Sequence, residues 1–234
     1  MTMNRLTQVL ALGIVMVVPA WGHAQTPAAA PPPAVERLGE KLFRIGQIRV
    51  DVARRELTVT GMVNPDVRAL EFIANPVEGA KAYESALTLD TTAVTFNAAL
   101  LMIGLDPKHV RNAPTRHFDP ATPEGDQVEI SFECQNAACP RRPAEQLMYD
   151  QQKQEVLTGG AWVYTGSAFF PDGGYMAERQ GVLIGFVHEP ASIIEYTGKG
   201  ALNRFGFIVP NPMLGLEPRT KVDVTIRAVA PVTP

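Results

Sequence analysis

The chain lacks an excess of charge of either sign and contains very little cysteine. Its 21 lysines and arginines are balanced by 24 aspartates and glutamates, which gives a net charge of -3 over 234 residues. A broad nucleic-acid-binding surface needs clustered lysine and arginine, so we expect no nucleic acid as a partner. The 2 cysteines are too few to ligate an iron–sulfur cluster.

Recognisable cofactor and catalytic motifs are also missing. The sequence contains no G-x-x-x-x-G-K-[ST] phosphate loop and no G-x-G-x-x-G after an expected strand. Ser167 is not in the G-x-S-x-G context of a nucleophile elbow, because the second glycine is absent. We therefore expect no cofactor and no metal, and no motif names a catalytic residue.

The composition that remains is that of a globular protein. Hydrophobic residues make up 46% of the chain and charged residues 19%, so a domain of this size can bury a real core. The 19 glycines and 20 prolines predict many turns and argue against a bundle of long helices.

Residues 1–24 have the pattern of a secretory signal peptide. Arg5 supplies the positive start, and residues 9–18 form an apolar run that is too short to span a bilayer. The small residues Gly22 and Ala24 predict cleavage before Gln25. An uncleaved N-terminal anchor is the alternative. We expect a periplasmic protein with no transmembrane segment in its mature chain.

A proline- and alanine-rich tether follows over residues 25–37. Three consecutive prolines, residues 31–33, favour an extended and solvated backbone. Residues 38–234 are then expected to form a single globular domain.

The periodicity of this domain predicts many strands and one strong helix. Residues 48–52 and 57–63 alternate apolar and polar side chains and are expected to pair as a hairpin. The helix is predicted over residues 93–105, with an N-cap from Asp90, Thr91 or Thr92. It is apolar on nearly every side, which predicts deep burial. Further strands are expected at residues 70–74, 83–89, 128–134, 147–149, 161–164, 175–187 and 221–227. The predicted fold class is α+β, a largely antiparallel sheet packed on one buried helix, with several irregular loops.

Four short motifs lie in order within residues 45–229. They are Lys81-Ala82-Tyr83-Glu84-Ser85, Ala98-Ala99-Leu100-Leu101-Met102-Ile103-Gly104, Trp162-Val163-Tyr164-Thr165-Gly166-Ser167 and Gly174-Tyr175-Met176-Ala177-Glu178-Arg179-Gln180-Gly181. Together they resemble the YdjY-like domain family of exported bacterial domains. The resemblance implies a location and a fold, and no mechanism, because the family has no established activity. The family pattern has His and Asp where this chain has Tyr83 and Glu178.

Cys134 and Cys139 are predicted to form a disulfide. Paired cysteines in an exported protein usually cross-link, and this bridge would close a small loop. Free or redox-active thiols and a metal site are the alternatives.

The loops around three of the motifs are the candidate binding site for a ligand or a partner. Its residues are Tyr83, Glu84, Ser85, Trp162, Thr165, Gly166, Ser167 and Glu178. Glu84 can serve as a base or a ligand anchor, or it can simply pair with Lys81 or a nearby arginine. The Thr165-Gly166-Ser167 turn can present N–H groups to an anion or can be a structural turn.

Two functions remain open at this stage. The first is a non-catalytic binding or accessory domain that engages an unknown periplasmic protein or small ligand. The second is a cell-envelope hydrolase that uses Glu84 as acid or base with His188 or His117. Asp119 stands two residues after His117, so these two side chains can also contribute to a metal site.

Overall fold

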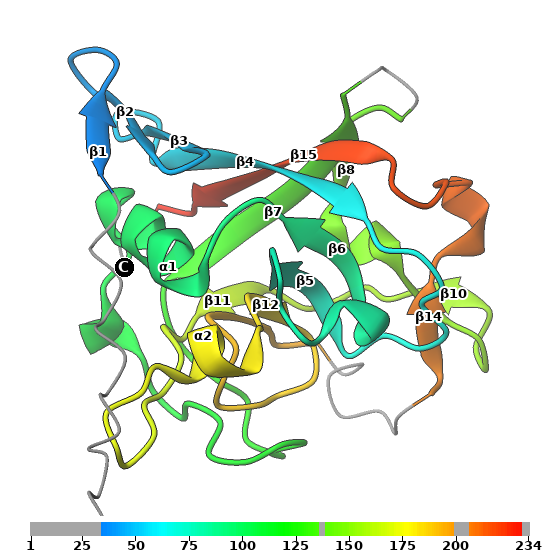
Figure 1. Ribbon diagram of the computed structural model, residues 1–234. Coiled ribbons are helices and arrows are strands. Elements are labelled where there is room, and N and C mark those ends of the chain that lie inside the picture. The colour runs from blue at the N-terminus through cyan, green and yellow to red at the C-terminus, as the bar shows by residue number, and fades with distance from the viewer. Residues whose placement is uncertain (1–33, 136–138, 199–205, 231–234) are drawn as a thin grey trace, which may run out of the picture. The chain divides into compact units, whose positions relative to one another are not determined.

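The computed structural model describes residues 34–135, 139–198 and 206–230 (Figure 1). Its α-helices are α1 (Ala93–Met102) and α2 (Met176–Gln180). Short 3-10 turns are η1 (Ala82–Glu84), η2 (Pro107–His109), η3 (Ala144–Leu147) and η5 (Pro212–Leu214). The strands are β1 (Val35–Arg37), β2 (Leu42–Ile45), β3 (Ile48–Asp51), β4 (Glu56–Val63), β5 (Phe72–Pro76), β6 (Ser85–Leu89), β7 (Gln127–Cys134), β8 (Arg142–Pro143), β9 (Met148–Asp150), β10 (Glu155–Val156), β11 (Trp162–Tyr164), β12 (Ile184–Gly185), β13 (Ile194–Tyr196), β14 (Ile208–Pro210) and β15 (Lys221–Ala228).

Eight strands close into a barrel in the order β4-β15-β7-β11-β13-β12-β5-β6. The pairing of β6 with β4 completes the circle. Gly61 of β4 lies opposite Leu89 of β6, and a Cβ at Gly61 would meet the Thr88 carbonyl oxygen at 2.5 Å. A glycine at this position therefore allows the two strands to approach closely enough to close the barrel.

The first half of β4 has a different neighbour from its second half. Residues Glu56 to Thr58 pair with β3, and residues Gly61 to Val63 pair with β6. The strands β1, β2 and β3 therefore continue the sheet outward from the barrel (Figure 1). A separate three-stranded sheet has the order β10-β9-β14.

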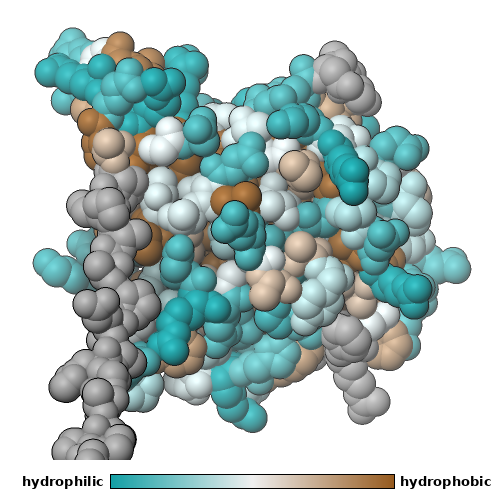
Figure 2. Space-filling view, in the orientation of Figure 1, coloured by the Kyte–Doolittle hydropathy of each residue, from teal (hydrophilic) through white to brown (hydrophobic). Residues whose placement is uncertain are grey.

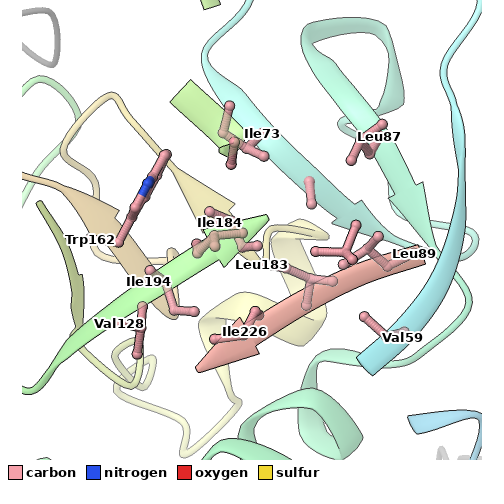
Figure 3. Close-up of a cluster of buried hydrophobic side chains, with 14 of the residues drawn as sticks. Val59, Ile73, Leu87, Leu89, Val128, Trp162, Leu183, Ile184, Ile194 and Ile226 are labelled. Atoms are coloured by element: carbon pink, nitrogen blue, oxygen red, sulfur yellow. The ribbon is translucent and has the colours of Figure 1, made fainter. Parts of the chain in front are cut away.

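The barrel interior is filled with apolar side chains from strands all around the wall (Figure 3). Alternate residues of each strand point inward, as period-two patterning requires. Val59, Leu89, Leu183, Ile194 and Ile226 are completely buried. The interior is therefore a packed core and leaves the outer wall as the place for polar chemistry.

The predicted α+β class was wrong, because the protein is mostly β and its sheet closes on itself. A closed barrel buries its own apolar face and needs no helix layer for that purpose. Helix α1 instead lies across one end of the barrel. Arg55, just before β4, donates to the Ile103 and Gly104 carbonyl oxygens, and the Tyr164 hydroxyl at the end of β11 donates to Asn97 Oδ1.

The predicted helix itself is confirmed, with Thr92 as its N-cap accepting a hydrogen bond from the Thr95 N–H. The predicted deep burial of this helix was wrong, because Val94 and Leu101 are 46% and 43% exposed. The strand expected at residues 175–187 was wrong in its first part, whereas β12 (Ile184–Gly185) lies in its second part. Its first part is α2, which ends at Gly181 in the left-handed conformation (φ 72°) that favours glycine.

The visible surface is a mixture of polar residues and small apolar patches (Figure 2). In the described part of the chain, no helix is both long enough and apolar enough to cross a membrane.

Candidate functional site

A groove lies on the outer wall of the barrel over β7 and β15, and its cavity volume is about 630 Å³. Strand β7 explains its polar floor. Val128, Ile130 and Phe132 point into the barrel and are buried, so Glu129 and Ser131 point outward into the groove. Arg142 and Pro143 of β8 line the groove beside β7, where β8 pairs with Ser131 and Phe132.

Most charged groups of the groove are already paired. Arg227 binds Glu56, and Arg141 donates to Glu133 Oε1 at 2.7 Å. The Trp162 indole N–H donates to Glu145 Oε1 at 2.8 Å. These contacts fix the groove side chains before any ligand arrives.

A second cleft adjoins the groove and shares Arg142, Pro143, Glu145 and Gly160 with it. Its volume is about 650 Å³. Its other walls include the apolar side chains of Val156, Leu157, Met213 and Leu214. Together the two clefts offer a polar half and an apolar half to one extended ligand.

The disulfide predicted between Cys134 and Cys139 is confirmed, with its two Cα atoms 5.0 Å apart. Cys134 ends β7, and its N–H donates to the Cys139 carbonyl oxygen. The cross-link therefore ties the end of β7 to the chain that leads into β8, at one end of the groove.

A cluster of buried carboxyl groups forms on another part of the outer wall. Its members are Glu71, just before β5, together with Glu189 and Glu195 of the segment that joins β12 to β13 and enters β13. All three are at most 5% exposed. Ile194 and Tyr196 point into the barrel, so Glu195 between them points outward, where its Oε1 accepts from the Glu189 N–H at 3.1 Å. We call these three residues the carboxylate cluster.

One histidine separates two members of the carboxylate cluster. The Nε2 atom of His117 lies 3.6 Å from Glu71 Oε2, and its Nδ1 atom lies 3.3 Å from Glu189 Oε2. The His117 side chain is 44% exposed, so the imidazole is the part of this arrangement that solvent reaches. His117 is therefore the exposed side chain that connects Glu71 and Glu189 to the surface of the protein.

Burial is the largest influence on the pKa of each carboxyl group in the carboxylate cluster. It raises the pKa of Glu195 well above its usual range. Burial also raises the pKa of Glu71 and of Glu189, while the nearby His117 and Lys81 oppose the rise. Two buried oxygen atoms, Glu189 Oε1 and Glu195 Oε2, have no hydrogen-bond partner among the described residues. Such groups are suited to holding protons.

No set of three or more His, Cys, Asp or Glu side chains in the described ranges is arranged to hold a metal.

The model of the YdjY domain matches residues 48–201 of the chain. The chain belongs to the YdjY domain family. This confirms the resemblance drawn from the four motifs. Neither the curated proteins nor the solved structures yielded a match. The matched residues of the YdjY domain include β7, β8 and β11 of the groove and all of the carboxylate cluster, whereas β15 lies beyond them.

The first group of candidate residues lies at the start of β6 in the YdjY domain. Tyr83 is 63% exposed, whereas Glu84 and Ser85 are buried. Glu84 forms an ion pair with Lys81, and the Ser85 hydroxyl donates to the Lys81 carbonyl oxygen at 2.8 Å. The sequence left two interpretations of Glu84 open, and the structure shows the one in which Glu84 pairs with Lys81.

The second group of candidate residues lies near the opposite end of the barrel. The Thr165 hydroxyl donates to the Ser192 carbonyl oxygen, and the Ser167 hydroxyl to that of Pro190. Gly166 and Ser167 both have positive φ, at 74° and 63°. These contacts describe a turn held by side-chain-to-backbone bonds. Glu178 accepts from the Val94 N–H at the start of α1, where a carboxylate suits the helix dipole.

Trp162 is the candidate residue that lines the groove, and the other seven do not line it. The structure therefore divides the predicted site of the YdjY domain among three places. The histidines are divided as well. His188 is buried, and its two ring nitrogens lie 3.1 and 3.0 Å from the carbonyl oxygens of Asp119 and Tyr196. Asp119 is held by the Thr115 and Ala121 N–H groups, which lower its pKa to about 2.

Sequence reasoning missed the carboxylate cluster of the YdjY domain. A signal was present, because Glu71 and Glu195 each interrupt an otherwise apolar run, Leu70-Glu71-Phe72 and Ile194-Glu195-Tyr196. A charged residue inside such a run marks a strand whose outer face is covered. Nothing in the sequence indicated that the groove forms on β7, since it depends on which strands become neighbours.

Proposed function

We propose that this YdjY domain is an exported periplasmic binding or accessory module that holds a ligand in the groove and carries out no catalytic step. The observation that carries the proposal is the pair of adjoining clefts, of about 630 and 650 Å³, on the outer wall. Cavities of this size are typical of ligand sites, and a polar half beside an apolar half gives orientation as well as affinity.

The separation of the groove from the carboxylate cluster favours binding over catalysis. No member of the cluster lines the groove or the adjoining cleft. Of the three carboxylates that line the groove, Glu56 and Glu145 are engaged by Arg227 and by the Trp162 indole. General acid–base catalysis needs a group of shifted pKa within reach of the bound molecule.

The carboxylate cluster supports a second candidate function, an acid–base enzyme acting on cell-envelope material. The specific observation is that His117 lies between Glu71 and Glu189, two carboxyl groups whose pKa burial raises. Glu84, the acid or base first considered, pairs with Lys81 and has no ion-pair contact with a histidine in the described residues. This function predicts that His117→Gln abolishes turnover of purified peptidoglycan, whereas a binding module gives no turnover in either form.

Photo-crosslinking in the producing cells tests the groove. A benzoyl-phenylalanine replaces Ser131, on the groove floor, or Thr60, which is outside the groove and, like Ser131, on the outer face. We expect a discrete adduct, measured by intact-mass spectrometry, from position 131 and none from position 60. Equal adducts from both positions, or none from position 131 and from a second groove position at Glu129, would overturn the proposal.

A further inference from the structure

The charged side chains that line the two clefts are gathered in one of them. Six charged residues line the groove: Glu56, Glu129, Glu145, Arg141, Arg142 and Arg227. Of these, Arg142 and Glu145 also line the adjoining cleft, which has no other charged residue among those that the structure describes. The combined site therefore passes from a charged groove, through a junction at Arg142 and Glu145, to an uncharged cleft.

The adjoining cleft exposes apolar surface to solvent. Met213 is 68% exposed, which is the highest exposure of any large hydrophobic residue in the described ranges, whereas Leu157 is a buried part of the wall. Val156 and Leu214, which also line this cleft, are half-buried. A methionine side chain is flexible and adapts to the shape of an apolar ligand. An alkyl chain in this cleft would remove apolar surface of both partners from water, which stabilises a complex.

Two groups of opposite charge in the groove lack an ion pair. Glu129 lies opposite Arg227 on the neighbouring strand β15, but Arg227 forms its ion pair with Glu56. Glu129 is exposed and pairs with no cationic group in the described part of the chain. Arg142 donates to the neutral Gln146 Oε1 at 3.1 Å and has no carboxylate partner within the same ranges. One anionic and one cationic position are therefore open to a ligand.

The charge balance of the lining favours a ligand that carries both signs. The three arginines and three glutamates leave no net charge. A ligand with negative charge alone would gain from Arg142 but would meet Glu145, which shares the junction. A ligand with positive charge alone would gain from Glu129 but would leave Arg142 unpaired. A zwitterionic head group gains at both positions, and a phosphate matches the planar fork of a guanidinium.

The separation of charged from apolar groups favours an amphiphile over a peptide. Successive side chains of an extended peptide point to opposite sides, so its charged and apolar groups are distributed along its length. A single-chain amphiphile has its charges at one end and its alkyl chain at the other, which matches the groove and the adjoining cleft. The two volumes, about 630 and 650 Å³, are those of sites for one small molecule.

We propose that the two clefts together bind one molecule of a zwitterionic single-chain amphiphile, the chemical class of a phospholipid with one acyl chain. Its phosphate binds Arg142, its ammonium group lies near Glu129, and its alkyl chain covers the apolar side chains of the adjoining cleft, including Met213. The proposal rests on the groove being the binding site and names the class of ligand.

Four octyl amphiphiles that differ in their head groups test this inference at concentrations below micelle formation. The head groups are phosphocholine with both charges, methyl phosphate with the negative charge, trimethylammonium with the positive charge, and uncharged glucoside. Titration is followed by the backbone amide signals of the ¹⁵N-labelled protein and by the ¹³C-labelled methyl groups of its methionines. We expect octyl phosphocholine to bind saturably, more tightly than the other three, and to shift the Glu129 amide and Met213 methyl signals.

The expected magnitudes separate the head group from the chain. The trimethylammonium compound lacks the charge-assisted bonds to Arg142 and should bind about tenfold more weakly. The methyl phosphate compound lacks the exposed contact with Glu129 and should bind about threefold more weakly. Decyl phosphocholine buries more of its chain and should bind about tenfold more tightly than the octyl compound. Glycerophosphocholine, which has no alkyl chain, should show no saturation.

Two variants assign the charges to their residues. Arg142→Gln should remove the preference for phosphocholine over trimethylammonium, and Glu129→Gln should remove the preference for phosphocholine over methyl phosphate. The matched controls are Arg49→Gln and Glu40→Gln, which change exposed charged residues outside both clefts. Both controls should leave the preferences unchanged.

Equal binding of the four octyl compounds, saturable binding of glycerophosphocholine as tight as that of octyl phosphocholine, or shifts that avoid Met213 would overturn the amphiphile assignment. If no amphiphile binds while crosslinking at position 131 still yields an adduct, the groove remains the binding site and only the ligand class is wrong. If the amphiphiles and the crosslinking both fail, the proposed function falls together with this inference.

Discussion

Carboxylates have opposite environments in two regions of the same barrel wall. In the groove, Glu56 is paired with Arg227 and Glu145 accepts from Trp162, so two of the three lining carboxylates are engaged at an open surface. In the carboxylate cluster, loops cover Glu189 and Glu195, and two carboxylate oxygens have no partner among the described residues. Open and satisfied polar groups suit recognition, whereas covered and unsatisfied ones suit the storage of protons. The loops over the wall, and not the wall itself, make this difference.

The largest expected effect comes from a change in the barrel core, which supports both regions. Ile194 points into the barrel and is completely buried, next to Glu195 on the same strand. Ile194→Ala should lower the free energy of unfolding by about 2–5 kcal/mol, because it leaves a cavity in a packed core. Urea denaturation measures this loss. Val94→Ala, at a position that is 46% exposed, is the control and should change stability by less than about 0.5 kcal/mol. Equal effects at both positions would contradict the barrel core.

Removal of the disulfide should affect the groove side alone. Replacing Cys134 and Cys139 by serine releases a cross-link between residues 5 apart in sequence, which should cost about 2 kcal/mol in the chain-entropy description. Hydrogen exchange should accelerate locally at Phe132 and Arg142, where β8 pairs with β7. Exchange at Glu195 should change only as far as global stability does. A uniform acceleration over both regions would show that the cross-link does not act locally.

The contribution of the carboxylate cluster to stability should depend on pH, whereas that of the groove should not. The pKa of Glu195 in the folded protein lies above that of an unfolded chain. The folded state therefore binds the proton more tightly, and the associated stability is complete below the unfolded pKa, about 4.3, and is lost as pH rises through the folded pKa. Glu195→Gln removes this titration and keeps an oxygen that accepts from the Glu189 N–H.

The variant Glu195→Gln should thus be more stable than the native chain by about 1–3 kcal/mol at pH 8, and the two should converge near pH 4. Urea denaturation at a series of pH values measures the difference. Glu133→Gln, which breaks the exposed pair with Arg141 on the groove side, should change stability by less than about 1 kcal/mol. A native chain that gains stability relative to Glu195→Gln as pH rises would refute the assignment.

The sequence predicted the local elements of this fold better than its closure. The hairpin of β3 and β4, the helix capped by Thr92 and the disulfide each depend on neighbouring residues, and all three are confirmed. Closure depends on β6 joining β4 at Gly61, a pairing between strands that are not consecutive. Period-two alternation is the same in an open sheet and in a barrel, so the pattern could not distinguish them.

The candidate site was predicted less well for a related physical reason. Motif residues such as Thr165 and Ser167 are engaged in turns, because hydroxyls beside glycine bond readily to nearby carbonyl oxygens. The groove on β7 has no signature in the sequence. Its position depends on which strands become the neighbours of β7, and only the folded sheet defines these pairings.

The smallest expected effect concerns the link between solvent and the carboxylate cluster. His117 lies between Glu71 and Glu189 and opposes the rise in their pKa that burial causes. His117→Gln keeps a side chain of similar size and removes the imidazole that lowers the pKa of Glu71 and Glu189, so the pKa of both carboxyl groups should rise further. Carboxyl ¹³C titration by NMR measures both shifts. His109→Gln, which removes the partner of Asp126 outside the cluster, should leave them unchanged. If both values fall or stay constant in His117→Gln, burial alone sets them, and the imidazole does not connect the cluster to solvent.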